Sequence, residues 1–183
     1  AHPESLIEDR PTGFGGYVPA NFDRDFQGTV TVRRALQLSL NVPAIKLLGA
    51  VVGVIVVGIG LAFFGTILVY LVAQEVIGDG LPAMSWDLLV KSAPMLDSKL
   101  LSLAFVFLLV GYGTKMGLAP MHTWLPDAHS EAPSPASALL SGVLLNCAYL
   151  GIFKTNKIMV AAGLGDFSGT ILMVFGLLSI MAA

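Results

Sequence analysis

Long apolar runs separated by short polar stretches dominate the chain from about residue 47 onward. The run from Leu47 to Gln74 contains no charged residue. About 20 helical residues cross a bilayer whose hydrocarbon layer is about 30 Å thick, so this run is long enough to span it. The pattern predicts about four transmembrane helices, the last of them truncated. Their expected bounds are 49–74, 99–119, 134–154 and 158–183.

Residues 1–46 follow a different pattern, because acidic and basic residues are spread along them. A loop rich in glycine and proline precedes a stretch from Val32 to about Leu40 that predicts one amphipathic helix. This segment is too short and too polar to bury a stable core alone. The predicted fold class is therefore all-α, a multi-pass transmembrane helical fragment with a short soluble N-terminal remnant.

Composition supports a membrane location. Hydrophobic residues make up 55% of the 183 residues and charged residues 12%, and the mean hydropathy is +0.80. Soluble domains are nearer about 25% charged. A net charge of -2 without a basic stripe argues against nucleic acid as a partner. Because the chain lacks an initiator Met and a signal peptide, we expect it to be an internal piece of something longer.

The connections between the predicted spans contain residues that predict loops, a helix start and membrane anchors. Glycines and prolines break the stretch from Glu75 to Lys99, which predicts a loop with a short interfacial helix at 86–91. Ser134 and Pro135 suit an N-cap and a first helical turn, so a helix is expected to start there. The lysines at 154 and 157 are interpreted as flanking anchors that end the third span. Basic residues before the first span favour a cytoplasmic start.

Lys115 is the strongest candidate for chemistry, because it stands at the end of an uncharged run among Gly111, Gly113 and Gly117. A charge at the centre of a membrane helix costs roughly 3 kcal/mol or more, so a charged residue there indicates a function. The glycines predict an interrupted helix, which is how membrane proteins hold ions inside a bilayer. In the bundle interior the ammonium form loses hydration, which favours release of its proton. The alternative is a lysine whose amine reaches the interface.

Polar residues gather directly after Lys115. Because histidine titrates near neutral pH, a proton relay can run from this loop to the lysine. The simpler alternative is an interfacial loop anchored by a tryptophan at headgroup level. The histidines lack the spacing of a metal-binding pair, so no metal site is predicted. The relay candidates are His122 and His129, with Trp124, Asp127 and Glu131 as the rest of the loop motif.

Asn146 lies in the middle of the third predicted span, with Ser137 and Ser141 on earlier turns. Such polar groups commonly hydrogen-bond neighbouring helices in a membrane. The more specific hypothesis is a hydrated proton path lined by these side chains.

The run from Gly113 to Asn146 closely resembles the proton-pumping, antiporter-like membrane subunits of respiratory complex I. It is most similar to the related subunit of membrane-bound, formate-hydrogenlyase-type hydrogenases, and the resemblance covers residues 49–183. In that family the lysine matching Lys115 sits on a discontinuous helix and carries protons. Asn146 stands where many complex I members place a second lysine. The glutamate that the family supplies from an earlier helix has no counterpart in this sequence.

Residues 1–48 instead resemble part of the transpeptidase domain of bifunctional penicillin-binding proteins, through runs such as Gly16–Asp23 and Gly28–Leu36. Ser39 and Asn41 would be the first and last residues of the Ser-x-Asn motif of that family. The acylating serine of Ser-x-x-Lys and the Lys-Thr-Gly strand are both missing. We therefore predict no transpeptidase activity and no acylation by penicillin.

The two resemblances imply different sides of the inner membrane for residues 1–48 and for the start of the first span. A transpeptidase works outside the inner membrane, whereas the pump helix would start in the cytoplasm. The chain is interpreted as a chimera, two gene fragments joined near residues 47–50.

The resemblance implies proton translocation by a membrane subunit of an NADH dehydrogenase- or hydrogenase-type complex in the bacterial inner membrane. Other membrane subunits and the lipid bilayer are the expected partners. No cofactor is expected in this chain, because the redox chemistry would belong to partner subunits. One alternative is a transpeptidase fragment with an apolar tail, inactive for lack of its nucleophile. Another is a nonfunctional helical membrane fragment.

Overall fold

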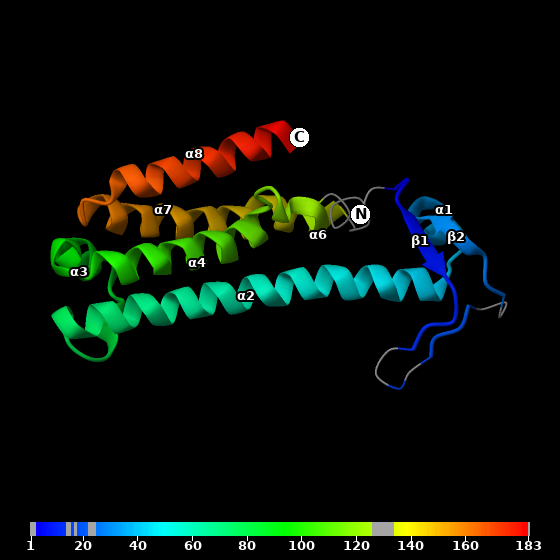
Figure 1. The fold of residues 1–183 in the computed structure, drawn as a ribbon, viewed down its shortest axis with the longest axis horizontal. Helices are drawn as coiled ribbons and strands as arrows, with labels where there is room; N and C mark the ends of the chain where they lie inside the picture. The colour runs from blue at the N-terminus through cyan, green and yellow to red at the C-terminus, as the bar shows by residue number, and fades with distance from the viewer. Residues whose placement is uncertain (1–2, 14–15, 17, 22–24, 126–133, 183) are drawn as a thin grey trace. The chain divides into compact units, whose positions relative to one another are not determined.

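The computed structural model describes residues 3–13, 16, 18–21, 25–125 and 134–182. The chain divides into two compact units, Ala1–Val54 and Ile55–Ala183. Figure 1 shows the elements of both units. Each unit has its own core of buried side chains.

The first unit contains a two-stranded antiparallel sheet, β1 (Leu6–Asp9) and β2 (Gly28–Thr31). It is followed by α1 (Val32–Gln37) and by the first turns of α2 (Asn41–Ile77). Val30, Ala35 and Leu40 form a small core on which Ile7 packs. The sheet was not among the predicted elements.

Helix α1 is shorter than the predicted helix 32–40. The side chain of Thr31 caps its start, where Oγ1 accepts from the Arg34 N–H at 3.2 Å. At its end the Leu40 N–H donates to the Ala35 carbonyl, and Ser39 adopts a φ of 51°. This left-handed residue turns the chain away from the helix axis, so the apolar pattern continues through a turn rather than through a helix.

A buried polar network holds this unit together. Asp9 and Asn21 are 0% and 3% exposed. The Asn21 amide Nδ2 donates to both Asp9 carboxylate oxygens at 2.9 and 2.8 Å. The Gln27 N–H donates to Asp9 Oδ2 and the Asn41 N–H to Asn21 Oδ1, each at 2.8 Å. Hydrogen bonds thus supplement an apolar core that is small.

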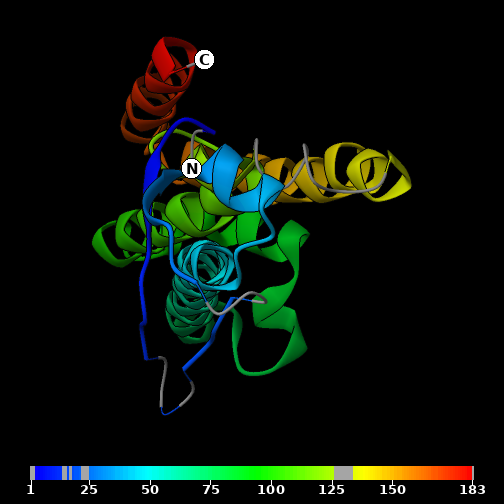
Figure 2. The same cartoon turned by 90° about the vertical axis from the view of Figure 1, so that its right-hand side faces the viewer.

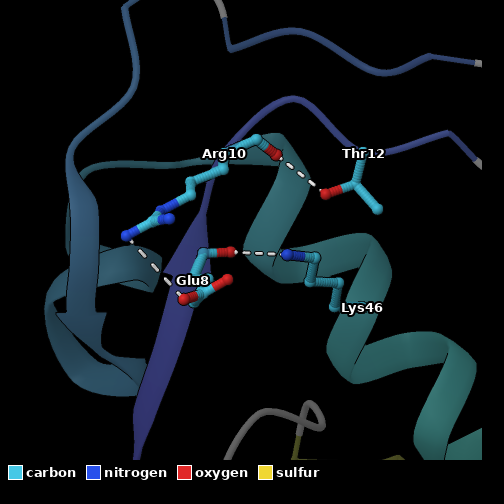
Figure 3. A network of polar contacts seen from close by, with 4 residues as sticks. All are labelled: Glu8, Arg10, Thr12 and Lys46. Carbon is cyan, nitrogen blue, oxygen red and sulfur yellow. Dashed lines mark hydrogen bonds and ion pairs between the residues drawn. The ribbon is translucent and has the colours of Figure 1, made fainter.

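A second set of polar contacts lies at the surface, where β1 meets the start of α2 (Figure 3). Lys46 Nζ donates to the Glu8 carbonyl at 2.9 Å, and Thr12 Oγ1 donates to the Arg10 carbonyl at 2.9 Å. The Arg10 guanidinium lies 3.9 Å from the Glu8 carboxylate, and both side chains are more than half exposed. Such exposed pairs contribute little to stability.

The second unit is helical. After α2 come the short turns η1 (Leu81–Met84), α3 (Trp86–Ser92) and η2 (Ala93–Met95), and then α4 (Ser98–Met116) and η3 (Met121–Trp124). One helix follows, made of α6 (Ser134–Leu139), the π-helical turn η4 (Leu140–Leu144) and α7 (Leu145–Ala161), and α8 (Gly165–Ala182) comes last. The predicted short helix at 86–91 and the predicted start at Ser134 are both present.

In the described part of the chain, four helices are long and apolar enough to cross a membrane, which confirms the predicted fold class. Glycines rather than charges set two of their ends. Gly117, with a φ of 81°, ends α4, and Gly163, with a φ of 77°, follows α7. Lys154 and Lys157 therefore lie inside the third span and do not end it. The apolar spans are Val52–Ile77, Ser98–Met116, Ser137–Ala161 and Gly165–Ala182.

Helices α2 and α4 pack closely because glycines face the contact. A Cβ atom on Gly111 would lie 2.5 Å from the Ala62 nitrogen, and one on Gly65 would lie 3.0 Å from the Leu108 nitrogen. Figure 2 views α2 nearly along its axis, with α4 beside it. Small residues allow such close helix contact in a membrane, but not every glycine of α2 is used this way, since a Cβ atom on Gly60 would have no atom within 4 Å.

The core of this unit surrounds α4. Its buried side chains come from the C-terminal half of α2, from η1, α3, η2 and α4, and from the C-terminal half of α7. The largest of them are Leu89, Leu101, Phe105, Leu109, Ile158 and Met159.

Candidate functional site

Lys115 lies in the last turn of α4 and is partly buried. The N–H groups of Gly117 and Leu118 both donate to the Gly113 carbonyl, at 2.9 and 2.8 Å. This arrangement closes the helix one residue after Met116 and replaces the predicted continuation to residue 119. Lys115 is therefore next to the negative end of the α4 dipole, a position that favours a cation.

Helix α4 ends well short of the helices beside it. Thr114 contacts Gly58, where a Cβ atom would lie 2.8 Å from the threonine side chain. The apolar span of α2 begins at Val52, roughly 9 Å further along the axis at 1.5 Å per residue. The Tyr112 ring lies against Gly151, and the α7 span begins roughly 21 Å before that glycine. The end of α4 thus falls within the thickness that its neighbours span.

The turn after α4 folds back onto the end of that helix. Trp124 is 5% exposed, and its Nε1–H donates to the Thr114 carbonyl at 2.7 Å. The Thr114 hydroxyl donates to the Val110 carbonyl at 2.8 Å and approaches the Met121 sulfur at 3.4 Å. Trp124 therefore caps a free carbonyl of α4 and is buried by protein, which differs from an anchoring tryptophan exposed at headgroup level.

His122 lies in the same turn and is partly buried. Its Nδ1 atom is buried and has no hydrogen-bond partner among the described residues. An unpaired buried polar atom costs about 1–3 kcal/mol, so such an atom calls for a functional explanation. Lys115 likewise makes no ion pair with any residue that the structure describes.

The predicted site residues thus divide into three groups. The end of α4 brings Lys115, His122 and Trp124 into one turn-helix junction. The second group, Asp127, His129 and Glu131, lies outside the described residues.

Asn146 forms the third group, because its side chain hydrogen-bonds within its own helix. Its Nδ2 donates to the Gly142 carbonyl at 2.8 Å, and the side chain is exposed. Gly142 belongs to the π-helical turn, where the wider spacing leaves carbonyls free of their usual partners. The Ser141 hydroxyl also bonds inside the helix, to the Ser137 carbonyl at 3.2 Å. The expected hydrogen bonds from Asn146 and Ser141 to a neighbouring helix are absent from the described residues.

A cavity of about 190 Å³ extends from Tyr112, one turn before Lys115, to Trp86 and Leu89 of α3, and the sequence pattern did not point to it. Hydroxyl groups reach it from three helices, at Thr66, Tyr112 and Thr155. The two threonine hydroxyls donate to the Ala62 and Gly151 carbonyls at 2.8 and 2.7 Å. The one available signal was the spacing of Tyr112, three residues before Lys115 and on the same helix face.

The described residues contain no group of three or more His, Cys, Asp or Glu side chains that could hold a metal ion. In the first unit, Ser39 and Asn41 serve the turn before α2. The Asn41 amide donates to the Ala20 carbonyl at 2.8 Å, and Ser39 is exposed at its left-handed φ.

The family described as NADH:quinone oxidoreductase/Mrp antiporter, TM, has a model that matches residues 43–183. The chain belongs to this family. The match covers the α4 junction and all four apolar spans.

Three similar proteins are, by name, components of hydrogenase-4 or a chain of an NAD(P)H-quinone oxidoreductase. The chain is 49% identical over 127 residues to the hydrogenase-4 component F homolog of Methylacidiphilum infernorum, which covers 69% of this chain and 27% of that protein. It is 38% identical over 115 residues to an NAD(P)H-quinone oxidoreductase chain 4 of Synechococcus sp., covering 63% and 21%. Hydrogenase-4 component B of Escherichia coli is 41% identical over 85 residues, covering 46% and 13%.

The chain therefore spans between 13% and 27% of the length of these relatives. No solved structure matches it. These comparisons lend no support to the transpeptidase resemblance of residues 1–48 or to a chimera, and the family match begins at residue 43, before the junction expected at 47–50.

Proposed function

We propose that this chain is part of a proton-translocating membrane subunit of a redox-driven complex, with Lys115 as the central proton carrier. The observation that carries the proposal is the lysine at the end of a helix that stops within the span of its neighbours. The family match supports it, because it covers this junction in a family of quinone oxidoreductase and antiporter transmembrane subunits.

Lys115 lacks a fixed ionic partner at this junction. It is partly buried and makes no ion pair with a described residue. A carboxylate partner would hold the ammonium group in one place, so its absence from the described residues leaves the side chain free to change its contacts. The cavity that reaches Tyr112, one turn before Lys115, contributes three hydroxyl groups within a mostly apolar lining.

His122 is the proposed feeder of Lys115. Its Nδ1 atom is buried without a partner in the described residues, and the turn that carries it packs on the last turn of α4. An imidazole exchanges protons near neutral pH through either ring nitrogen. His129 and Asn146 are proposed to extend the path, and Asp127 and Glu131 to complete the loop motif, on the sequence resemblance alone.

The proposed partner subunits and the proposed membrane are inferred from the relatives. The chain is a multi-pass membrane protein whose relatives are subunits of larger complexes. We infer that other membrane subunits of such a complex are its partners, that the redox cofactors belong to them, and that the membrane is the bacterial inner membrane.

The decisive experiment is Lys115→Met in the full-length parent subunit within its complex. Methionine keeps the length and apolar stem of lysine and removes the charge, so folding is preserved. We expect the proton flux per electron to fall at least tenfold, measured with a pH-sensitive dye in sealed vesicles. The amount of assembled complex is expected to stay the same.

Lys99→Met is the matched control, because it changes an exposed lysine at the opposite end of the same helix. It is expected to leave the flux unchanged. Normal pumping by an assembled Lys115→Met complex would exclude Lys115 as the carrier.

A further inference from the structure

A groove of about 370 Å³ lies between α3 and the C-terminal half of α7. It is at the end of the helical unit where α2 ends and α8 begins, opposite the end that holds Lys115 (Figure 1). The groove is therefore separate from the proposed proton site, and its role is independent of that function.

Positive charge dominates this groove. Lys91 comes from α3, and Lys154 and Lys157 come from successive turns of α7. Asp87 is the acidic side chain among the lining residues. None of the three lysines makes an ion pair within the described parts of the chain. The groove thus holds three cations against one carboxylate, without a protein anion that neutralises them.

Aromatic rings hold two of these amines in place. Lys154 Nζ lies 5.4 Å from the centre of the Trp86 ring, and Lys157 Nζ lies 5.0 Å from the centre of the Phe153 ring. A cation over an aromatic face is attracted by the ring quadrupole, so the amines are positioned before a ligand arrives. The rings also give the groove apolar walls.

The depth of the groove in the membrane matches a headgroup. Lys154 and Lys157 precede the end of α7 at Ala161 by roughly 10 and 6 Å along the helix axis. A tryptophan beside them is typical of the interfacial layer, where its ring contacts both acyl chains and headgroups. Cations at this depth therefore meet lipid phosphates before they meet bulk water.

We propose that this groove binds an anionic phospholipid, with the three lysines around its headgroup phosphate and the aromatic walls against its acyl chains. Basic pockets between transmembrane helices bind such headgroups through charge attraction. The apolar walls favour a lipid over free phosphate, because an inorganic ion would leave the rings without a partner. The unneutralised lysines favour an anionic lipid over a zwitterionic one.

The test uses Trp86 as a reporter inside the groove. The 183-residue chain is placed in phosphatidylcholine nanodiscs that contain a small fixed fraction of phosphatidylglycerol with brominated acyl chains. Subtracting the emission of Trp86→Phe isolates the Trp86 signal from that of Trp124. We expect brominated phosphatidylglycerol to quench Trp86 several-fold more effectively than brominated phosphatidylcholine at the same fraction.

The lysine variants then assign the preference to the groove. One lysine near an anionic headgroup contributes about fivefold, so Lys154→Gln is expected to reduce the preference about fivefold. Changing all three lysines to Gln is expected to abolish it, and changing all three to Arg to retain it. Lys99→Gln, an exposed lysine outside the groove lining, is the control that is expected to change nothing.

Three results would overturn the proposal. The first is equal quenching by the two brominated lipids, or an unchanged preference when all three lysines are Gln. The second is relief of the quenching by inorganic phosphate, which would make the groove a site for free anions. The third is loss of the preference in the assembled parent complex, which would assign the groove to an acidic segment of another subunit.

Discussion

Polar groups lie in the interior of both units of this chain, but they are hydrogen-bonded in the first unit, whereas some of those in the second lack partners among the described residues. In the first unit, the Asp9 carboxylate accepts from Asn21 and Gln27, and Asn21 passes the network on to Asn41. At the end of α4, by contrast, Lys115 has no ion pair and His122 Nδ1 no hydrogen bond among the described residues. A saturated network fixes a structure, whereas these polar groups at the end of α4 have no such fixed partners among the described residues.

The surroundings explain why the two solutions differ. Residues of the first unit fold with few apolar side chains, so a satisfied hydrogen-bond network must supply specificity that a larger core would give. The second unit has an extensive apolar core around α4. Such a core stabilises the fold enough to tolerate an unpaired group of about 1–3 kcal/mol at one helix end.

The largest effect that would sharpen this comparison is expected at His122. His122→Phe replaces the imidazole by an apolar ring of similar size, which removes the unpaired nitrogen. General acid–base groups contribute about 10²–10⁴-fold to proton transfer, so we expect at least a tenfold loss of proton flux in the parent complex. The unfolding midpoint in detergent is expected to stay or rise, because an unpaired polar atom has been removed from the interior.

A lower unfolding midpoint in His122→Phe would break the comparison. It would mean that the imidazole has a stabilising partner. His122→Gln provides a second measurement, since it keeps a polar group at this position while removing the titratable ring.

A smaller effect, on stability alone, is expected at Asp9. Asp9→Ala leaves the Gln27 N–H without its acceptor and the Asn21 amide with the Asp25 carbonyl alone, which costs about 3 kcal/mol. Hydrogen exchange measured by mass spectrometry is expected to speed up across β1 and β2 and to stay unchanged in α4. Glu8→Ala is the control on the neighbouring residue, whose side chain is exposed, and is expected to change stability by less than about 0.5 kcal/mol.

Equal protection of β1 and β2 in Asp9→Ala and Glu8→Ala would show that the buried network is not what holds the first unit together. Proton flux is expected to be the same in both variants, because neither residue lies in the helical unit.

The smallest effect concerns the close contact between α4 and α2. A Cβ atom on Gly111 would meet the α2 backbone at Ala62, so Gly111→Ala is expected to cost about 1–3 kcal/mol through overpacking. Gly60→Ala is the matched control in α2, where a Cβ meets nothing within 4 Å. Helix propensity favours that change by up to about 1 kcal/mol. Thermal unfolding of the two variants in the same detergent checks the difference, and equal midpoints would contradict the proposed close packing of α2 on α4.

Much of the fold could be predicted from local pattern. Lipid offers the backbone no hydrogen-bond partners, so long uncharged runs must be helices, and the four spans could be found by length and composition. The short helix after Trp86 and the start at Ser134 were indicated by proline, glycine and serine signals of the same local kind. The two-stranded sheet escaped prediction because β1 and β2 are four residues each and lie 18 residues apart in the sequence.

The ends of the helices were less predictable. Lys154 and Lys157 were expected to stop a span, but a lysine can stay helical when an aromatic ring and a lipid-facing groove accommodate its amine. The cavity at Thr66 and Thr155 could not be predicted either, because its polar lining comes from helices that are distant in sequence.

By itself, the sequence determined that this chain crosses a membrane several times and that Lys115 is exceptional, because a charge next to an uncharged run is costly in hydrocarbon wherever its neighbours lie. The tertiary structure decided the depth at which α4 stops, the use of Trp124 as a cap on Thr114, and the confinement of the Asn146 bond to its own helix. These outcomes depend on contacts such as Gly58 with Thr114, between residues more than 50 positions apart, which no local pattern contains.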